Sequence, residues 1–179
     1  GWQSGKTALC RYLNKGDDMA DTEDLKKERV ENGNLEKLVA LQTIYIKDVS
    51  FEAPNSPGVF LETEVNPETK INLSNMHTKV GDNSYDVALK IKVESTYGEK
   101  TIFIAEVEQG GVFTIKGYTE EETKSLIAVF CPNTLFPFVR EVVASLVTKA
   151  GFPALLLQPI NFEALYSQAR EEAEEEKPN

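Results

Sequence analysis

Three observations predict an α+β fold, in which a four-stranded antiparallel sheet with Greek-key-like order is followed by C-terminal helices. Between residues 43 and 115, apolar residues alternate with polar ones, as half-buried strands require. After residue 119 they recur every three or four positions, as in amphipathic helices. All of the predicted strands precede all of the predicted helices, which indicates a sheet with helices to one side rather than alternating units.

The first predicted strand contains a change of phase. Its side chains Ile44 and Ile46 occupy even positions, whereas Val49 and Phe51 occupy odd ones. Because strand side chains alternate between two faces, a regular strand would place these two pairs on opposite faces. We therefore predict a β-bulge near residues 47–48, which returns all four side chains to one face.

Turn residues divide the next part of the sheet. The Pro/Gly-rich cluster at 53–58 ends the first strand, and a second, irregular extended stretch runs from 59 to 73. Residues 85–94 alternate strictly between apolar and polar side chains, which predicts a third strand with one buried face. The tight connection at 97–99 makes the fourth strand antiparallel to the third.

The fourth strand carries apolar side chains on both faces. It covers residues 101–109, and Gly110-Gly111 is expected to bend the chain before residues 112–115. Since both faces carry apolar groups, we expect both to be covered. A four-stranded sheet also leaves two open edges. The excess apolar surface and the open edges together predict self-association.

The last third of the chain reads as helices. Residues 119–122 have the pattern of a capping box, and residues 131–133 are expected to break that helix, with Asn133 capping the next one. An apolar stripe follows between 139 and 150, and Gly151 suits the position after a helix end. Asn161 is placed to cap a final helix.

Composition divides the chain into four segments. Residues 1–18 differ from the rest and are interpreted as an added leader, although they contain Ser-Gly-Lys-Thr; the glycine spacing there does not match a phosphate-binding loop. Residues 19–38 are expected to form a mobile arm and 39–168 the folded domain. Residues 169–179 are expected to be a disordered acidic tail.

The charge balance restricts the partners. The chain has 29 acidic and 19 basic residues, which gives a net charge of −10. Such a chain repels nucleic acid and anionic lipid, so we expect basic proteins or basic segments as partners and neither nucleic acid nor membrane insertion. No apolar run approaches the ~20 residues that cross a bilayer, and no secretory signal is recognisable, so a cytoplasmic location is expected.

Histidine and cysteine usage argues against several kinds of enzyme. The single histidine, His77, lies in the polar stretch 75–79, which is predicted to be a loop. The two cysteines, Cys10 and Cys131, are too far apart in sequence to suggest a disulfide framework, which fits a reducing compartment. These residues do not suggest a Ser-His-Asp triad or a zinc site, so no enzyme activity, metal or cofactor is predicted.

Two groups of residues are candidates for binding. Carboxylates at Asp48, Glu52, Glu106 and Glu108 lie on or beside strands, where they fit either a solvated face with cross-strand lysine pairs or a docking surface for a basic segment. The second group consists of phenylalanines on either side of the Pro/Gly-rich loop, which suit an adaptable apolar groove. They are Phe51 and Phe60.

Four segments resemble one known family. They are IYIKDVSFEAPN at 44–55, EVEQGGVF at 106–113, CPNTLFPFVRE at 131–141, and FP at 152–153 followed by PINFEAL at 159–165. Four long strings in the same order make chance similarity an insufficient explanation. Over about residues 39–168 the chain resembles the SecB family of bacterial protein-export chaperones.

The resemblance implies an assembly and an activity. SecB-like proteins are cytosolic homotetramers built as dimers of dimers, in which four-stranded sheets join edge to edge and long helices pack between the sheets. They are not enzymes and use no nucleotide or other cofactor. They hold unfolded preproteins and deliver them to SecA, the translocase motor, whose zinc-bearing C-terminal segment is basic.

The resemblance also implies three groups of functional residues. The docking face for SecA is expected at Asp48, Glu52, Ile104 and Glu106. The client groove is expected at Phe51, Phe60, Phe113 and Phe138. The surface that governs assembly of dimers into tetramers is expected at Ala105, Val107 and Gln109.

Three other functions remain as alternatives. A SecB-like chaperone dedicated to a toxin–antitoxin pair would have one narrow client. An enzyme using Glu106 and Glu108, or Asp48 and Glu52, would need a cleft that the sequence does not indicate. A structural oligomer would have no client at all.

Overall fold

A computed structural model describes residues 36–62 and 66–175 of the chain. The predicted leader at 1–18, most of the predicted arm and the last four residues of the predicted tail lie outside the described residues. The described residues all belong to one compact unit.

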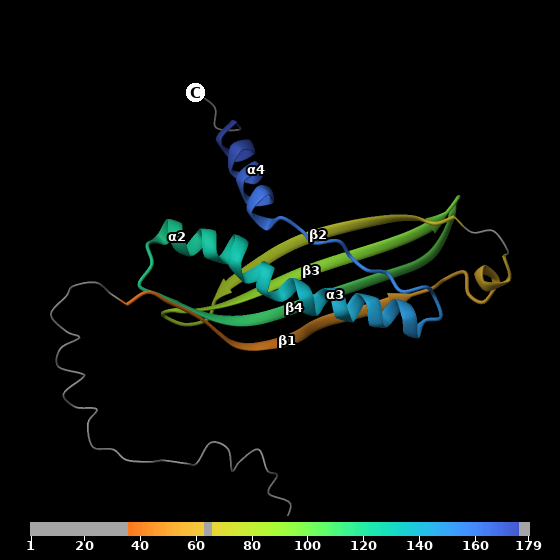
Figure 1. The fold of residues 1–179 in the computed structure, drawn as a ribbon, viewed down its shortest axis with the longest axis horizontal. Coiled ribbons are helices and arrows are strands. Elements are labelled where there is room, and N and C mark those ends of the chain that lie inside the picture. The colour runs from red at the N-terminus through yellow and green to blue at the C-terminus, as the bar shows by residue number, and fades with distance from the viewer. Residues whose placement is uncertain (1–35, 63–65, 176–179) are drawn as a thin grey trace, which may run out of the picture. The chain divides into compact units, whose positions relative to one another are not determined.

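The described part of the chain contains a four-stranded antiparallel sheet in the order β1-β4-β3-β2 (Figure 1). Strands β2, β3 and β4 follow one another as hairpins, and β1 lies beside β4, so the predicted Greek-key order is confirmed. The strands are β1 (Leu38–Glu52), β2 (Glu68–Lys79), β3 (Ser84–Tyr97) and β4 (Lys100–Lys116).

The predicted bulge is present in β1. The pairing of β1 with β4 shifts register between Ile46 and Asp48, and it also shifts between Leu41 and Thr43, which the sequence pattern did not indicate. Beyond the bulge at Lys47, Val49 lies opposite Val107, and before it Ile46 lies opposite Gln109. The apolar side chains on either side of the bulge therefore share one face of the sheet.

The predicted helix break at 131–133 is wrong. Helix α2 (Glu120–Ser125), a π-helical turn η3 (Leu126–Phe130) and α3 (Cys131–Lys149) form one continuous helix. The Cys131 N–H bonds to the carbonyl of Leu126, five residues earlier. This wider turn lies directly before Pro132, whose missing N–H and ring would disturb a regular helix, and the chain continues without an interruption.

The helix ends agree better with the sequence. Thr119 and Glu122 form the predicted capping box, and Gly151 follows α3 with a φ of 90°. Asn161 accepts a hydrogen bond from the Ala164 N–H at 3.0 Å, as expected of the cap of α4 (Phe162–Glu175). Residues 169–175 of the predicted acidic tail are therefore helical.

The core lies between the long helix and one face of the sheet. Figure 1 shows α3 lying across the sheet, and Val139, Val143 and Val147 are buried in the same cluster as Leu89 of β3 and Val107 of β4. By length and composition the helix 120–149 is apolar enough to cross a membrane. Because this helix packs against the sheet, its apolar composition is that of a core helix.

Three local predictions need correction. Residues 58–61 form a short 3₁₀ turn, η2 (Gly58–Leu61), and are not extended. His77 lies in β2 opposite Val87, and not in a loop. Gly110 and Gly111 do not bend the chain, because β4 runs through both. A Cβ on Gly110 would lie 2.5 Å from Cζ of Tyr45, so glycine is needed there for close packing.

Candidate functional site

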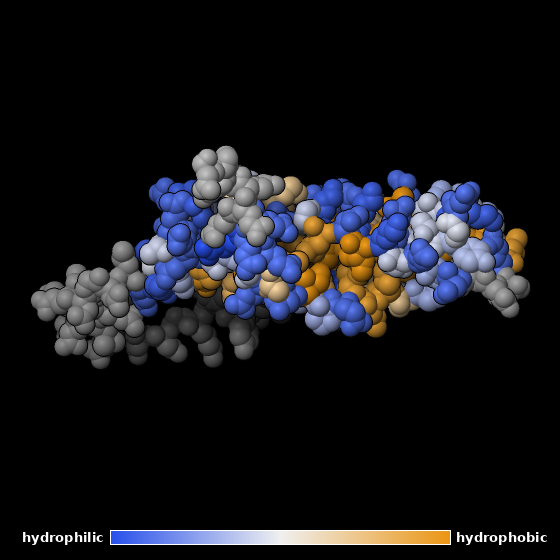
Figure 2. All heavy atoms as spheres, turned by 90° about the horizontal axis from the view of Figure 1, so that it is seen from above, coloured by the Kyte–Doolittle hydropathy of each residue, from blue (hydrophilic) through white to orange (hydrophobic). Residues whose placement is uncertain are grey.

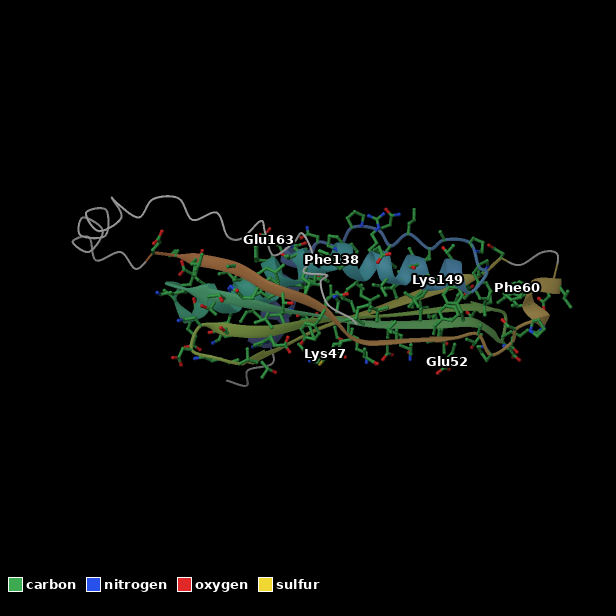
Figure 3. All side chains as sticks on the ribbon, turned by 90° about the horizontal axis from the view of Figure 1, so that it is seen from below. Lys47, Glu52, Phe60, Phe138, Lys149 and Glu163 are labelled. Carbon is green, nitrogen blue, oxygen red and sulfur yellow. The ribbon has the colours of Figure 1, made fainter. Side chains whose placement is uncertain are left out.

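The face of the sheet opposite α3 carries the candidate carboxylates. Cross-strand pairs place Asp48 opposite Glu108, Ser50 opposite Glu106, and Glu52 opposite Ile104. Directly paired residues point to the same side of an antiparallel sheet. Figure 3 shows Lys47 and Glu52 on the side away from Phe138 and Lys149 of α3. The surface formed by Asp48, Glu52, Ile104, Glu106 and Glu108 is called the acidic face below.

The next strand brings lysines to the edge of the acidic face. Lys90 of β3 lies opposite Glu108, and Lys92 lies opposite Glu106. The Lys90 Nζ forms an ion pair with Glu106 Oε1 at 2.6 Å. This hydrogen bond is the main cause that lowers the pKa of Glu106 and raises that of Lys90. One of the expected cross-strand pairs is therefore formed.

A second polar cluster holds the bulge of β1 from this side. The Tyr45 hydroxyl donates a hydrogen bond to Asp86 Oδ1 at 2.7 Å, and Lys47 lies 3.5 Å from the other oxygen of Asp86 and 3.6 Å from Glu108 Oε1. The bond to Asp86 raises the pKa of Tyr45 to about 12. From the α3 side, Gln109 Nε2 donates to the Tyr45 carbonyl at 2.6 Å. The bulge is thus held from both faces.

At one end of the sheet, beside η2, the chain encloses an apolar pocket of about 420 Å³. Figure 3 shows Phe60 at this end. Three segments that are distant in sequence supply the apolar walls: η2, the start of β4 and the segment that follows α3. Their apolar lining residues include Val59, Phe60, Ile102, Phe103, Phe152 and Leu155.

A chain of phenyl rings lines and backs this pocket. The ring of Phe60 lies 4.9 Å from that of Phe152, which lies 5.2 Å from that of Phe103. Phe103 in turn stacks on Phe51 at 5.6 Å. Half of the Phe60 surface, 49%, remains exposed. The two phenylalanines expected to share a groove, Phe51 and Phe60, are therefore joined through two rings that the sequence did not single out.

The other two expected groove residues lie elsewhere. Phe113 is fully buried in the core, so its expected place on the groove surface is corrected. Gly111 packs against it from the same face of β4, since a Cβ on this glycine would lie 2.9 Å from the Phe113 ring. Phe138 is half exposed on α3 but does not line the pocket.

The three residues expected to govern tetramer assembly are also buried. Ala105, Val107 and Gln109 expose 0%, 0% and 3% of their surface and lie on the face of β4 that α3 covers. A second chain could not touch them in this arrangement. Any effect on assembly would pass through α3, or through β1 by way of the Gln109 bond to Tyr45.

Considerable apolar surface remains uncovered in the described part of the chain. Figure 2 shows apolar residues gathered in a patch bordered by polar ones. β1, which is an edge strand, exposes four large apolar side chains by 38–51%, and the long helix exposes two phenylalanines. They are Leu38, Leu41, Ile46, Val49, Phe130 and Phe138.

Metal-binding and nucleophilic residues do not gather at either site. Within residues 36–62 and 66–175, no group of three His, Cys, Asp or Glu side chains is arranged to hold a metal ion. Cys131 is fully buried, and burial raises the pKa of its thiol to about 12. A thiol in this state is a packing group and not a nucleophile.

Comparisons with known proteins place this geometry in a family. The family model described as preprotein translocase subunit SecB matches residues 32–173. The protein-export protein SecB of Nitrosococcus oceani is 46% identical over 84% of this chain and 92% of the relative. That of Marinobacter nauticus is 45% identical over 76% of this chain and 82% of the relative.

A solved structure supports the fold. The SecB-like chaperone of Mycobacterium tuberculosis, solved in complex with a peptide from an antitoxin, matches with a TM-score of 0.58 and 16% identity. The match covers 68% of this chain and 90% of that chain. The sheet order, the continuous helix and the matches over most of the chain lead to one conclusion: the chain belongs to the SecB family of preprotein translocase subunits.

Proposed function

We propose that this protein, a protein-export chaperone by family, holds unfolded preproteins in the cytoplasm without nucleotide and delivers them to SecA. Holding needs an apolar surface that accepts many sequences, and delivery needs a second surface that stays free while the client is bound. The protein has a candidate for each of these surfaces.

The apolar pocket is the proposed client site. An unfolded chain exposes apolar side chains. Burying them against the rings of Phe60, Phe103 and Phe152 lowers the free energy. Each such contact is weak. Several pockets on a homotetramer of this chain would bind several segments of one client, and multivalency would make total retention strong.

The acidic face is the proposed docking site for the basic, zinc-bearing segment of SecA. Its carboxylates lie on two adjacent strands, so the sheet's hydrogen bonds fix the spacing of their backbones. Ile104 provides an apolar contact on β4, opposite Glu52 and two residues from Glu106. Such a surface attracts a basic segment at long range and selects it by the position of its charges.

One observation carries the proposal: consecutive residues along β1 and along β4 point to opposite faces of the sheet. Phe51 stacks on Phe103 behind the pocket, whereas the next residue on each strand, Glu52 and Ile104, belongs to the acidic face. A client in the pocket therefore does not cover the docking surface. Simultaneous binding is what delivery requires.

A refolding assay tests the holding activity. A slow-folding, denatured preprotein is diluted into buffer with and without the protein, without nucleotide, and its refolding is followed by fluorescence. We expect the protein to stop refolding and Phe60→Ala to weaken this effect. Phe130→Ala is the matched control, because Phe130 is 45% exposed on the long helix and does not line the pocket. If this protein is folded but the preprotein refolds at the same rate with and without it, general holding is overturned.

The alternative is a chaperone dedicated to a toxin–antitoxin pair. The M. tuberculosis structure with its antitoxin peptide motivates it through a common fold. The two functions differ in breadth. A general export chaperone should hold several unrelated denatured preproteins, whereas a dedicated chaperone should hold one antitoxin and ignore the rest.

The proposal includes a dimer of dimers. The open edge of β1 and its exposed apolar side chains give a second copy both unpaired backbone groups and surface to bury. Sedimentation equilibrium should give four times the chain mass, and dilution should produce dimers before monomers. A stable monomer at micromolar concentration would contradict the assembly.

A further inference from the structure

Lys90 occupies an unusual position for a cation. It lies on β3 within the sheet, and its side chain, one third exposed, reaches across to Glu106 at 2.6 Å. It lies directly opposite Glu108, and Glu108 lies directly opposite Asp48 on the next strand. The charges of all three carboxylates act on this one ammonium group and raise its pKa. Lys90 is thus the inner counter-ion of the acidic face.

The carboxylates of the acidic face are neutralised unevenly. Glu106 is paired with Lys90, and Glu108 lies 3.6 Å from Lys47. Within residues 36–62 and 66–175, no lysine or arginine lies within 4 Å of the carboxylates of Asp48 or Glu52. Among these residues, the two carboxylates of β1 therefore have no ion-pair partner, whereas both carboxylates of β4 have one.

We propose that Lys90 is an internal counter-ion that limits the affinity of the acidic face, because it holds the place that a basic side chain of the docking partner takes and has to be displaced from Glu106. The proposal rests on the docking function proposed for this face. A lysine suits the role, since its flexible stem and single hydrated charge let it exchange partners readily. An exposed pair of this kind is weak enough to be replaced.

Displacement lowers the affinity of the face for partners that place a second cation on Glu106. One cation is attracted by the open carboxylates of β1. A second has to offer Glu106 as good a contact as Lys90 gives, and Lys90 then moves into solvent. A segment with a single positive charge gains only the first contact. The self-pairing thus lowers the affinity of a segment whose second cation reaches Glu106 and changes little for a segment with a single charge.

Replacing the counter-ion tests the proposal. Lys90→Met keeps most of the stem and removes the charge. The probe is a synthetic zinc-loaded C-terminal segment of SecA, with its affinity measured by calorimetry on the full-length protein at two salt concentrations. We expect Lys90→Met to bind about three- to ten-fold more tightly, with a steeper loss of affinity as salt rises. A probe with one basic residue replaced should gain less from Lys90→Met than the intact probe, because it has no second cation that has to displace Lys90.

Lys70→Met is the matched control. Lys70 lies on β2, at the sheet edge away from β1, and its register partner is Glu94 of β3. The change in net charge is the same, but no carboxylate of the acidic face is released. We expect less than about a two-fold change in affinity, since Lys70 lies two strands from β4, its exposed charge is screened, and the pair of Lys90 with Glu106 is kept. Circular dichroism and urea unfolding of both variants check that the fold is kept.

The outcomes separate the two proposals. If the wild type binds the probe but Lys90→Met binds no more tightly than Lys70→Met, the role of Lys90 is overturned and docking stands. If neither the wild type nor Lys90→Met binds, docking on this face is overturned together with it. In the background of Glu106→Gln, the gain from Lys90→Met should shrink, because the displaced contact no longer exists; an undiminished gain also overturns the proposal.

Discussion

The acidic face and the apolar pocket differ in the kind of contact that each offers to a partner. The acidic face is built on two paired strands, where backbone hydrogen bonds fix the spacing of Asp48, Glu52 and Glu106. The pocket is bounded by a short 3₁₀ turn and by the segment after α3, and one of its rings is half exposed. Fixed charges suit one partner of defined sequence, whereas rings at the edge of a loop suit many clients. On the proposed function, this difference would let one small domain serve a specific and a general partner together.

The largest loss of stability is expected from a substitution in the core that the two regions share. Phe113→Ala should lower the free energy of unfolding by about 3–5 kcal/mol, because it removes a fully buried ring between sheet and helix. Urea unfolding followed by circular dichroism measures it. If the urea midpoint stayed unchanged while client holding was lost, Phe113 would belong to the pocket after all.

A substitution at Gly110 should disturb the acidic face alone. In Gly110→Ala the new Cβ would meet the Tyr45 ring at 2.5 Å, so the ring must move and its bond to Asp86 must weaken. We expect a loss of about 1–3 kcal/mol in unfolding free energy and weaker binding of the basic segment. Gly58→Ala is the control, since its Cβ meets no atom within 4 Å. Equal effects of both substitutions would contradict this account.

Phe152→Leu should disturb the pocket alone. The substitution removes the ring that contacts both Phe60 and Phe103, at a cost of about 0.5–1.5 kcal/mol beyond the lost area. Client retention should fall while affinity for the basic segment stays the same. A change in both would mean that the two regions are coupled through the strands they share.

The smallest effect is a dependence on alkaline pH. The pKa of Tyr45 is about 12 in the folded protein, whereas the ordinary value for an unfolded chain is 10. The folded state therefore keeps a proton that the unfolded chain loses between these two values. Stability should therefore fall as pH rises through this window. Tyr45→Phe should give a flatter dependence of the urea midpoint on pH. The same slope in both proteins would show that Asp86 does not hold this hydroxyl.

Strand periodicity made much of the acidic face predictable. The slip of phase between Ile46 and Val49 is visible in the sequence, and a bulge was its only simple resolution. The placing of Asp48 and Glu52 on one docking face was implied by the family resemblance. Lys90 was visible only as a possible cross-strand partner, because its pairing with Glu106 depends on the β3–β4 register.

The pocket was only half predictable. Phe51 and Phe60 flank a Pro/Gly-rich loop, which marked them as unusual. Phe103 and Phe152 reach the same place from β4 and from the turn after α3, and no local pattern reports such a meeting. Phe113 was expected in the groove because of the family resemblance, not because of a local pattern. A strand that continues puts residue 113 in the core.

The bulge at Lys47 and the strands that both surfaces share limit where residues can be inserted into this chain or deleted from it. Because Phe51 and Glu52 point to opposite faces of the sheet, a single inserted or deleted residue between Val49 and Glu52 would exchange the two sets of side chains. Both binding surfaces would be lost in one step. Residues 53–57 join β1 to η2 outside any strand, so length changes should be tolerated there. Homologous chains should therefore vary in length within this connection and stay constant along the end of β1.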